Sequence, residues 1–233
     1  MLTLAIETSG PSGSIAVVEA GQLVSEEALE LGKQHGQSLI PAIGRVLAQC
    51  GKTPRDIELV AVSTGPGSFT GLRVGVVCAK TFAYATGCRL AAVDTLLAMA
   101  CNSPEDVSQV EVVCDAHRGD LAVGRYARRE DKKWEPARPI EVLSAADWMA
   151  QLAPETIVTG PALEKLASQF GGRCRVLPSE TRVPRAIWIA RLGVEAVEAG
   201  QVATPWSLEP VYLRRSSAEL QWEKLHPRKG IEN

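Results

Sequence analysis

Short apolar segments alternate with glycine-containing turns at the start of the chain. LTLAIET, residues 2–8, is followed by SGSIAVVEAGQLVSEEAL, residues 12–29, and this alternation predicts three strands joined by two turns. Apolar residues then recur at steps of three and four, which predicts a helix whose apolar face holds Leu39, Ile43, Val46, Leu47 and Cys50. Because Pro41 is tolerated only in the first turn of a helix, we expect this one to begin near Leu39 or Ile40.

A buried strand follows and leads into a second helix. IELVAVSTG, residues 57–65, is nearly all apolar, as in a strand covered on both faces. GLRVGVVCAKTFAYATG, residues 71–87, predicts a helix that ends at Gly87, and CRLAAVD, residues 88–94, predicts a strand before a short helix at 95–101. This order of elements predicts a mixed sheet with helices packed on it.

The second half of the chain loosely repeats the first after the polar segment NSPEDVSQ. We place a boundary there and expect an N-terminal lobe over residues 1–103 and a C-terminal lobe over 104–233. The elements expected in the second lobe are strands at 110–116, 120–128, near 139–143 and at 156–160, and helices at 144–153, 161–170 and 185–200. The tail from residue 205 is polar, and we expect it to have irregular structure past Arg214. The sequence leaves open whether the final segment packs back on the first lobe.

Composition and charge narrow the range of functions. Apolar residues make up 45% of the 233 and charged residues 22%, and the net charge of −2 gives no general attraction to nucleic acid. No segment approaches the ~20 apolar residues that span a membrane, and the N-terminus lacks a signal-peptide pattern, so we expect a cytoplasmic protein without membrane contact. The six cysteines form no C-x-x-C pair, which argues against zinc.

The turn between the buried strand and the second helix, GPGSFTGLRVG at 65–75, has two interpretations. Glycine and proline turn the chain, and Ser68 or Thr70 would cap the helix. A glycine-rich loop at a helix N-terminus also suits an anion. The spacing matches neither the P-loop nor the dinucleotide motif G-x-G-x-x-G.

The helix that starts at this turn carries two stripes. One stripe of small residues would allow a close approach to the sheet or to another helix, and consists of Gly71, Gly75, Ala79 and Ala83. The other mixes cations with apolar residues, and consists of Arg73, Val76, Val77, Lys80 and Tyr84. We expect the second stripe to point outward, because its cations are hard to bury. This mixture suits a protein interface with a charged rim, with an ordinary half-exposed face as the alternative.

Five motifs resemble those of the bacterial TsaB (YeaZ) family. They are LAIETS at 4–9, H-x-x-x-LIP-x-I at 35–43, GPGSFTGLRVG-x-x-x-AK at 65–80, DAHRGDLAVGRY at 115–126 and PVYLR at 210–214. The resemblance covers nearly the whole chain, and it implies an α/β fold of the actin/Hsp70/sugar-kinase (ASKHA) type, with two similar lobes and a mixed sheet in each. Three residues depart from the family's usual motifs: Glu7 stands where Asp is usual, and His117 and Leu121 are unusual in the fourth motif.

The same resemblance implies a function in tRNA modification. TsaB proteins help to install a threonylcarbamoyl group on the adenosine beside the anticodon in tRNAs that read codons starting with A. They act as partners of the catalytic subunit TsaD and of the small ATPase TsaE, so tRNA contact is expected to be indirect. By resemblance the first two helices dock TsaD, and without TsaD the same surface could form a homodimer. We assign this interface to Arg45, Gln49, Arg73, Val76, Val77, Lys80 and Tyr84.

The residues favour a subunit without catalysis. The H-x-x-x-H metal pair of related TsaD proteins is reduced to His35, because Leu39 stands four residues on, so we expect no metal and no cofactor. Pro161 removes an N–H where a phosphate-binding turn would lie. The older glycoprotease label of the broader family has no support in these residues. A degenerate nucleotide-like cleft is left at Glu7, Thr8, Ser9, Gly65, Pro66, Gly67 and Ser68.

Two alternatives stay open at this point. The chain could be a nucleotide-dependent ATPase or carbamoyl-type transferase that acts in this cleft. It could also contact tRNA directly through the basic segment RYARREDKKWEPAR at 125–138, although a solvated hairpin tip suits that segment better.

Overall fold

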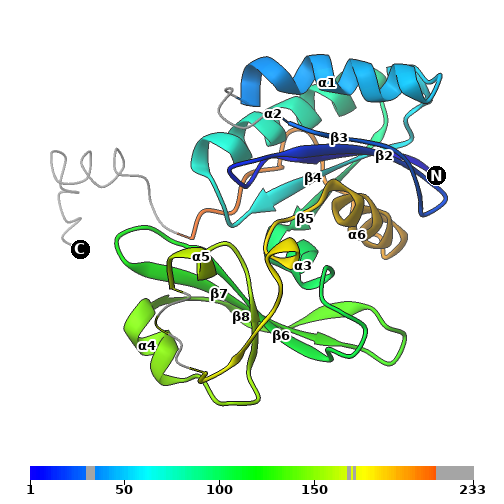
Figure 1. Ribbon diagram of the computed structural model, residues 1–233. Helices are drawn as coiled ribbons and strands as arrows, with labels where there is room; N and C mark the ends of the chain where they lie inside the picture. The colour runs from blue at the N-terminus through cyan, green and yellow to red at the C-terminus, as the bar shows by residue number, and fades with distance from the viewer. Residues whose placement is uncertain (30–34, 167–168, 170–171, 214–233) are drawn as a thin grey trace, which may run out of the picture.

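Five strands from the first 94 residues form a mixed sheet in the computed structural model, which describes residues 1–29, 35–166, 169 and 172–213 (Figure 1). The first three strands pair antiparallel and are β1 (Leu2–Glu7), β2 (Ser14–Glu19) and β3 (Gln22–Ala28). β4 (Leu59–Gly65) runs parallel to β1, and β5 (Arg89–Asp94) runs parallel to β4. The order is β3-β2-β1-β4-β5, so the most apolar strands, β1 and β4, lie inside the sheet.

Helices cover both faces of this sheet. α1 (His35–Gln49) and α2 (Phe69–Thr86) pack on one face, and α6 (Ala186–Glu198) packs on the other (Figure 1). α1 begins earlier than expected, with Pro41 inside it rather than in its first turn. Pro41 lies on the exposed side of α1, so its ring displaces no core side chain. The short helix α3 (Thr95–Ala100) follows β5 and is capped by the side chain of Asp94.

The second sheet repeats the topology of the first. Its order is β10-β9-β6-β7-β8, with β6 (Gln109–Asp115), β7 (Asp120–Arg128) and β8 (Trp134–Ser144) antiparallel, and with β9 (Ile157–Thr159) and β10 (Arg175–Val176) parallel. Its helices are α4 (Ala145–Ala150) and α5 (Leu163–Leu166). Two lobes with the same strand order confirm the predicted two-lobed ASKHA-type fold.

The details of the second lobe differ from the expectation. β8 begins earlier than predicted, and β10 was not predicted at all. Only residues 163–166 of the helix expected at 161–170 are described as α5, and residues 167, 168 and 170 lie outside the described residues. Short 3-10 turns at Pro54–Asp56 and Ser179–Thr181 complete the described secondary structure.

The chain returns to the first lobe after the second sheet. α6 packs against β1, β2 and β4, where Gly193 lies so close to Ala61 that an added Cβ would be 2.5 Å from the Ala61 Cβ. Residues 201–213, which we call the C-terminal strap, then bind β5 and β4 by backbone hydrogen bonds from Ala203 to Leu90 and from Val211 to Thr64. Part of the predicted C-terminal lobe, 104–233, therefore packs on the first sheet. The tail past Arg214 lies outside the described residues.

Candidate protein interface

The glycine-rich turn serves as the start of α2. Ser68 is the N-cap, because its Oγ accepts a hydrogen bond from the Gly71 N–H at 3.3 Å. The Ser68 N–H in turn donates to the Ser9 carbonyl at 2.7 Å. The turn is thereby fixed to the loop that follows β1. These contacts support the turn-and-cap interpretation, with Ser68 rather than Thr70 as the cap.

The residues assigned to a degenerate cleft come together at the carboxyl ends of β1 and β4. Thr8 Oγ1 donates to the Gly71 carbonyl at 2.8 Å, and a Cβ on Gly67 would lie 2.6 Å from the Ser9 carbonyl oxygen. Five of the seven are buried, and Gly67 and Ser68 are exposed. The loop after β1 and the start of α2 therefore pack directly on each other, which leaves no room between them for a phosphate.

Glu7 is the one ionisable residue in this cluster, and it is fully buried. Its Oε1 accepts hydrogen bonds from the N–H and the Oγ of Ser9, both at 2.5 Å. Its Oε2 has no hydrogen-bond partner within the described part of the chain. Burial raises the pKa of Glu7, because it disfavours the charged form, and the hydrogen bonds from Ser9 offset only part of this effect.

We expect Glu7→Gln to raise the melting temperature at pH 8. The pKa of Glu7 in the folded protein lies above its ordinary value, so folding is favoured when this carboxyl is protonated. That contribution to stability is fully present below the ordinary pKa. It is lost as the pH rises through the pKa of the folded state. Glutamine keeps the oxygen that accepts from Ser9 and never ionises. Thermal unfolding of both proteins between pH 4 and pH 8 should show a gap that closes toward acid. A constant gap would mean that the charge of Glu7 is not its cause.

The structure corrects one interface residue. Val76 is only 2% exposed and packs in the core between α1, α2 and the sheet, so the expectation that it points outward is wrong. Its neighbour Val77 is 61% exposed, and Tyr84 is 70% exposed. Adjacent helical residues point about 100° apart, and here that angle separates the core from the surface.

The charged members of the predicted interface have partners within the chain. Lys80 donates to the Leu208 carbonyl of the strap at 3.0 Å, and Arg73 Nε donates to the Tyr212 hydroxyl at 2.9 Å. On α1, Arg45 binds Glu27 of β3, and Gln49 accepts from Ser25 of β3. Arg45 and Gln49 are therefore turned toward the edge of the sheet.

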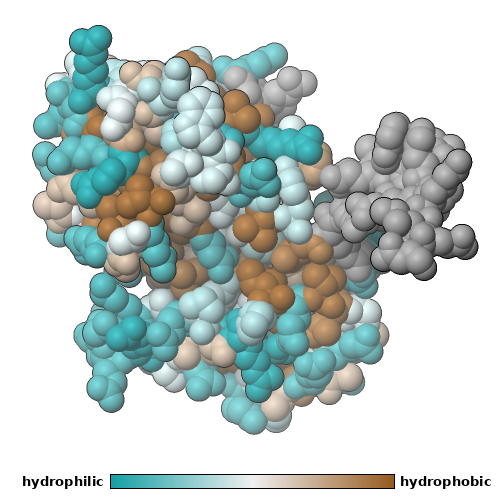
Figure 2. Space-filling view, turned by 180° about the vertical axis from the view of Figure 1, so that it is seen from behind, coloured by the Kyte–Doolittle hydropathy of each residue, from teal (hydrophilic) through white to brown (hydrophobic). Residues whose placement is uncertain are grey.

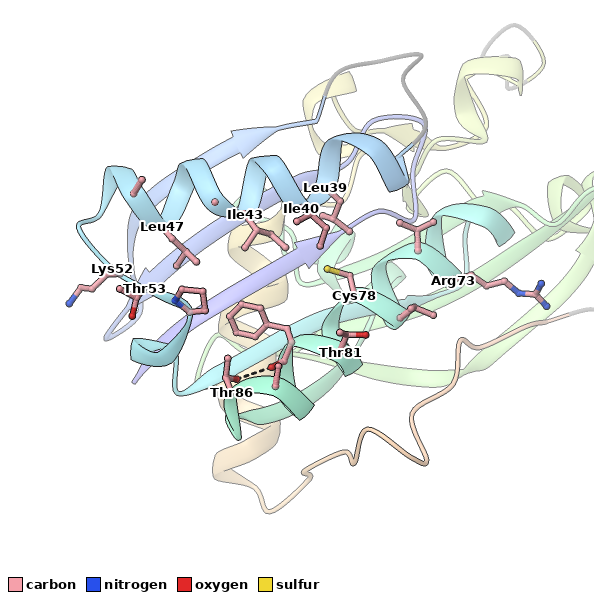
Figure 3. Close-up of a pocket in the computed structure, with 17 residues that line it drawn as sticks. Leu39, Ile40, Ile43, Leu47, Lys52, Thr53, Arg73, Cys78, Thr81 and Thr86 are labelled. Atoms are coloured by element: carbon pink, nitrogen blue, oxygen red, sulfur yellow. Dashed lines mark hydrogen bonds between the residues drawn. The ribbon is translucent and has the colours of Figure 1, made fainter.

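An apolar groove of about 880 Å³ runs between α1 and α2. Side chains from both helices point into it in Figure 3, and Figure 2 shows apolar groups at the surface of the same lobe. We call it the α1–α2 groove. Its lining residues are Leu39, Ile40, Ile43, Gly44, Leu47, Ala48, Lys52, Thr53, Pro54, Arg73, Val74, Val77, Cys78, Thr81, Phe82, Ala85 and Thr86. Ile40 is 62% exposed at its rim. Such a contiguous apolar surface is typical of a protein-binding site.

The apolar residues of α1 that line this groove were not among the predicted interface residues, which on this helix were Arg45 and Gln49. The sequence predicted that the apolar residues of α1 belong to the core, and Leu39, Ile43 and Leu47 are indeed buried. The available signal was the width of the apolar face: Ile40 next to Leu39, with Ile43 and Leu47 beyond, covers a broader arc than one contact with the sheet requires.

Candidate chemistry elsewhere is sparse in the described residues. They contain no group of three His, Cys, Asp or Glu side chains placed to hold a metal. His117 is exposed in the β6–β7 turn, and His226 lies outside the described residues. No described helix is long and apolar enough to cross a membrane.

Acidic neighbours pair with much of the basic segment at 125–138. Arg125 contacts Glu111 and Glu141. Arg129 lies 3.6 Å from Asp131 and 3.5 Å from Glu135, and Lys133 lies 3.4 Å from Glu195 of α6. This pairing reduces the positive field that a direct contact with tRNA phosphates would need.

Comparison with known proteins identifies the family. Residues 27–201 match the family model of TsaD, described as tRNA N6-adenosine threonylcarbamoyltransferase. The tRNA threonylcarbamoyladenosine biosynthesis protein TsaB of Bacillus subtilis is 30% identical over 229 residues, which are 95% of this chain and 98% of that protein. The chain belongs to the TsaB family. The TsaB of Escherichia coli is 28% identical over 97% of this chain and 98% of its own length.

A solved structure supports the fold of this TsaB family member. YeaZ from Pseudomonas aeruginosa superposes with a TM-score of 0.76 at 24% identity, over 91% of this chain and 99% of that chain. A second crystal structure, described as an uncharacterized protein with similarity to peptidase YEAZ from the same organism, gives a TM-score of 0.78. The TsaB family and its two-lobed fold are thus established for this chain, and its curated relatives are named as tRNA threonylcarbamoyladenosine biosynthesis proteins.

Proposed function

We propose that this chain is a non-catalytic subunit that supports threonylcarbamoyl modification of adenosine in tRNAs reading codons that start with A, by binding a TsaD-family enzyme. The observation that carries the proposal is the α1–α2 groove, an open apolar surface on a chain whose relatives are named as tRNA threonylcarbamoyladenosine biosynthesis proteins. The partner would insert an apolar helix face, because a groove between two helices suits one.

The proposed interface comprises the groove together with the exposed α2 residues Arg73, Val77 and Tyr84. TsaE would join as a third component, tRNA would be contacted through the partner, and the complex would act in the cytoplasm. A homodimer of this chain would use the same groove, and so would compete with TsaD. The tight packing of the Glu7 cluster supports the assignment of catalysis to the partner.

Reconstitution tests this proposal. Purified TsaD-family enzyme and TsaE from the same organism should form the modified adenosine in tRNA only when this chain is added, as measured by mass spectrometry of tRNA nucleosides. The chain by itself should not turn over ATP, which separates the proposal from an ATPase or carbamoyl-type transferase. Equal modification in its absence, or ATP turnover by the isolated chain, would contradict the proposed function.

A further inference from the structure

Trp206, in the C-terminal strap, is the most exposed of the large apolar side chains in the described chain, at 79%. It lies in a turn that is held by local hydrogen bonds. The Ser207 N–H donates to Thr204 Oγ1 at 3.1 Å, the Thr204 and Ser207 hydroxyls are 2.8 Å apart, and the Leu208 N–H donates to the Thr204 carbonyl at 3.1 Å. The indole is therefore presented to solvent by an ordered turn.

The strap around this turn is fixed to the first lobe on both sides. Before it, the Ala203 N–H donates to the Leu90 carbonyl at 2.9 Å. After it, Leu208 is 5% exposed in the core beneath α2, and its carbonyl accepts from Lys80. The conformational entropy of the strap is therefore already lost when the chain folds. A partner that contacts Trp206 meets a preorganised surface and does not have to order it on binding.

Trp206 is continuous with the outer surface of α2. Its ring meets that of Tyr84 edge to face, with centroids 5.7 Å apart. Tyr84 and Val77 are seven residues apart, which places them within about 20° of one line along a helix of 3.6 residues per turn. Val77 lines the α1–α2 groove, and Ile40 lies on its other side. A band of exposed apolar side chains therefore crosses from α1 over α2 to the strap.

We propose that Trp206 is an anchor residue of the surface that binds the TsaD-family partner, so that this surface extends beyond the two helices onto the strap. This inference rests on the proposed function. The partner would present an apolar pocket for the indole beside the helix face that fills the groove. Tryptophan in a rigid setting beside other aromatic and aliphatic side chains is the typical hot spot of a protein interface. A second copy of this chain is the competing occupant.

Trp206→Ala should weaken binding of the TsaD-family partner by at least tenfold, measured by titration calorimetry with the full chain. Its melting temperature should stay within a degree of the parent's, because the removed side chain is mostly in solvent. Val183→Ala is the matched control: Val183 is 37% exposed in the loop before α6, away from the band, and its loss should leave affinity unchanged. Tyr84→Ala combined with Trp206→Ala should be less than additive, because the two rings contact each other.

The outcomes separate this inference from the proposed function. If Val77→Glu abolishes binding while Trp206→Ala leaves it unchanged, the inference is overturned and the groove remains the interface. If the parent chain forms no complex with the TsaD-family enzyme, both fail. Sedimentation of the chain alone tests the other occupant: a change in self-association without a change in partner affinity would assign Trp206 to a homodimer and overturn the inference.

Discussion

Val77→Glu is expected to lower the affinity of this chain for a TsaD-family partner by more than tenfold, which corresponds to a loss of more than about 1.4 kcal/mol of binding free energy. Val77 is 61% exposed on α2 and lines the α1–α2 groove. In the free chain a glutamate there would remain in water. In the complex its carboxylate would be desolvated against an apolar helix of the partner, which is unfavourable, and the guanidinium of Arg73, which already donates to Tyr212, would offset only part of that cost.

The measurement is titration calorimetry of the full-length chain with the purified partner, together with thermal unfolding of the free variant. Gln109→Glu is the control for charge, because it adds the same negative charge at an exposed position in the second lobe. It should leave both affinity and melting temperature unchanged. If Val77→Glu and Gln109→Glu bind equally well, the groove is not the binding surface.

Val76→Glu, one residue away, is expected to destabilise the fold rather than to weaken docking alone. Val76 is 2% exposed, so a glutamate would bury a carboxylate among apolar side chains, and we expect a loss of about 4 kcal/mol or more in the free energy of unfolding. Any loss of binding by this variant would then follow from unfolding. The two valines together distinguish a defect in docking from a defect in folding, which neither substitution could do alone.

The contrast between the two valines shows what the sequence could predict. The apolar runs of β1 and β4, the glycine turns and the repeated order of elements were sufficient for two lobes with mixed sheets, because these signals are local. The small-residue stripe of α2 was also assigned to a packed face, and Gly71, Gly75 and Ala79 are buried. The buried face of α2 is wider than this stripe, and local periodicity could not show on which side it widens. In the structure it widens to include Val76.

The surface itself depends on contacts between distant parts of the chain. Lys80 binds the carbonyl of Leu208, 128 residues further on, so the cation that made this face look exposed is half-buried under the strap. The groove arises from the spacing of α1 and α2 on the sheet, and no periodicity in either helix gives that spacing. No sequence pattern marked Trp206 as an interface residue, because that role depends on its contact with Tyr84, which is far away in the sequence.

Gly71→Ala is expected to destabilise the fold by about 3 kcal/mol, despite the higher helix propensity of alanine. A Cβ at this position would lie 2.0 Å from the Thr8 carbonyl oxygen, which is backbone and is held in place because the Thr8 side chain also binds the Gly71 carbonyl. The N-terminus of α2 would have to move away from β1, and the cap at Ser68 and the contact with Ser9 would move with it. For a chain of this length, we expect a fall of about 10 °C in melting temperature.

Gly44→Ala is the matched control, because Gly44 is also a helical glycine but has nothing within 4 Å of an added Cβ. It should stabilise the protein by about 0.5–1 kcal/mol, as an exposed glycine-to-alanine change in a helix does. Denaturant unfolding of both variants would therefore give opposite signs. If both raised stability, α2 could shift from β1 at little cost, and the glycine of the GPGSFTGLR motif would owe its presence to something other than this packing. If instead Gly71→Ala lowers and Gly44→Ala raises the free energy of unfolding, Gly71 is required for the contact between α2 and the loop after β1. The position of the proposed interface depends on that contact.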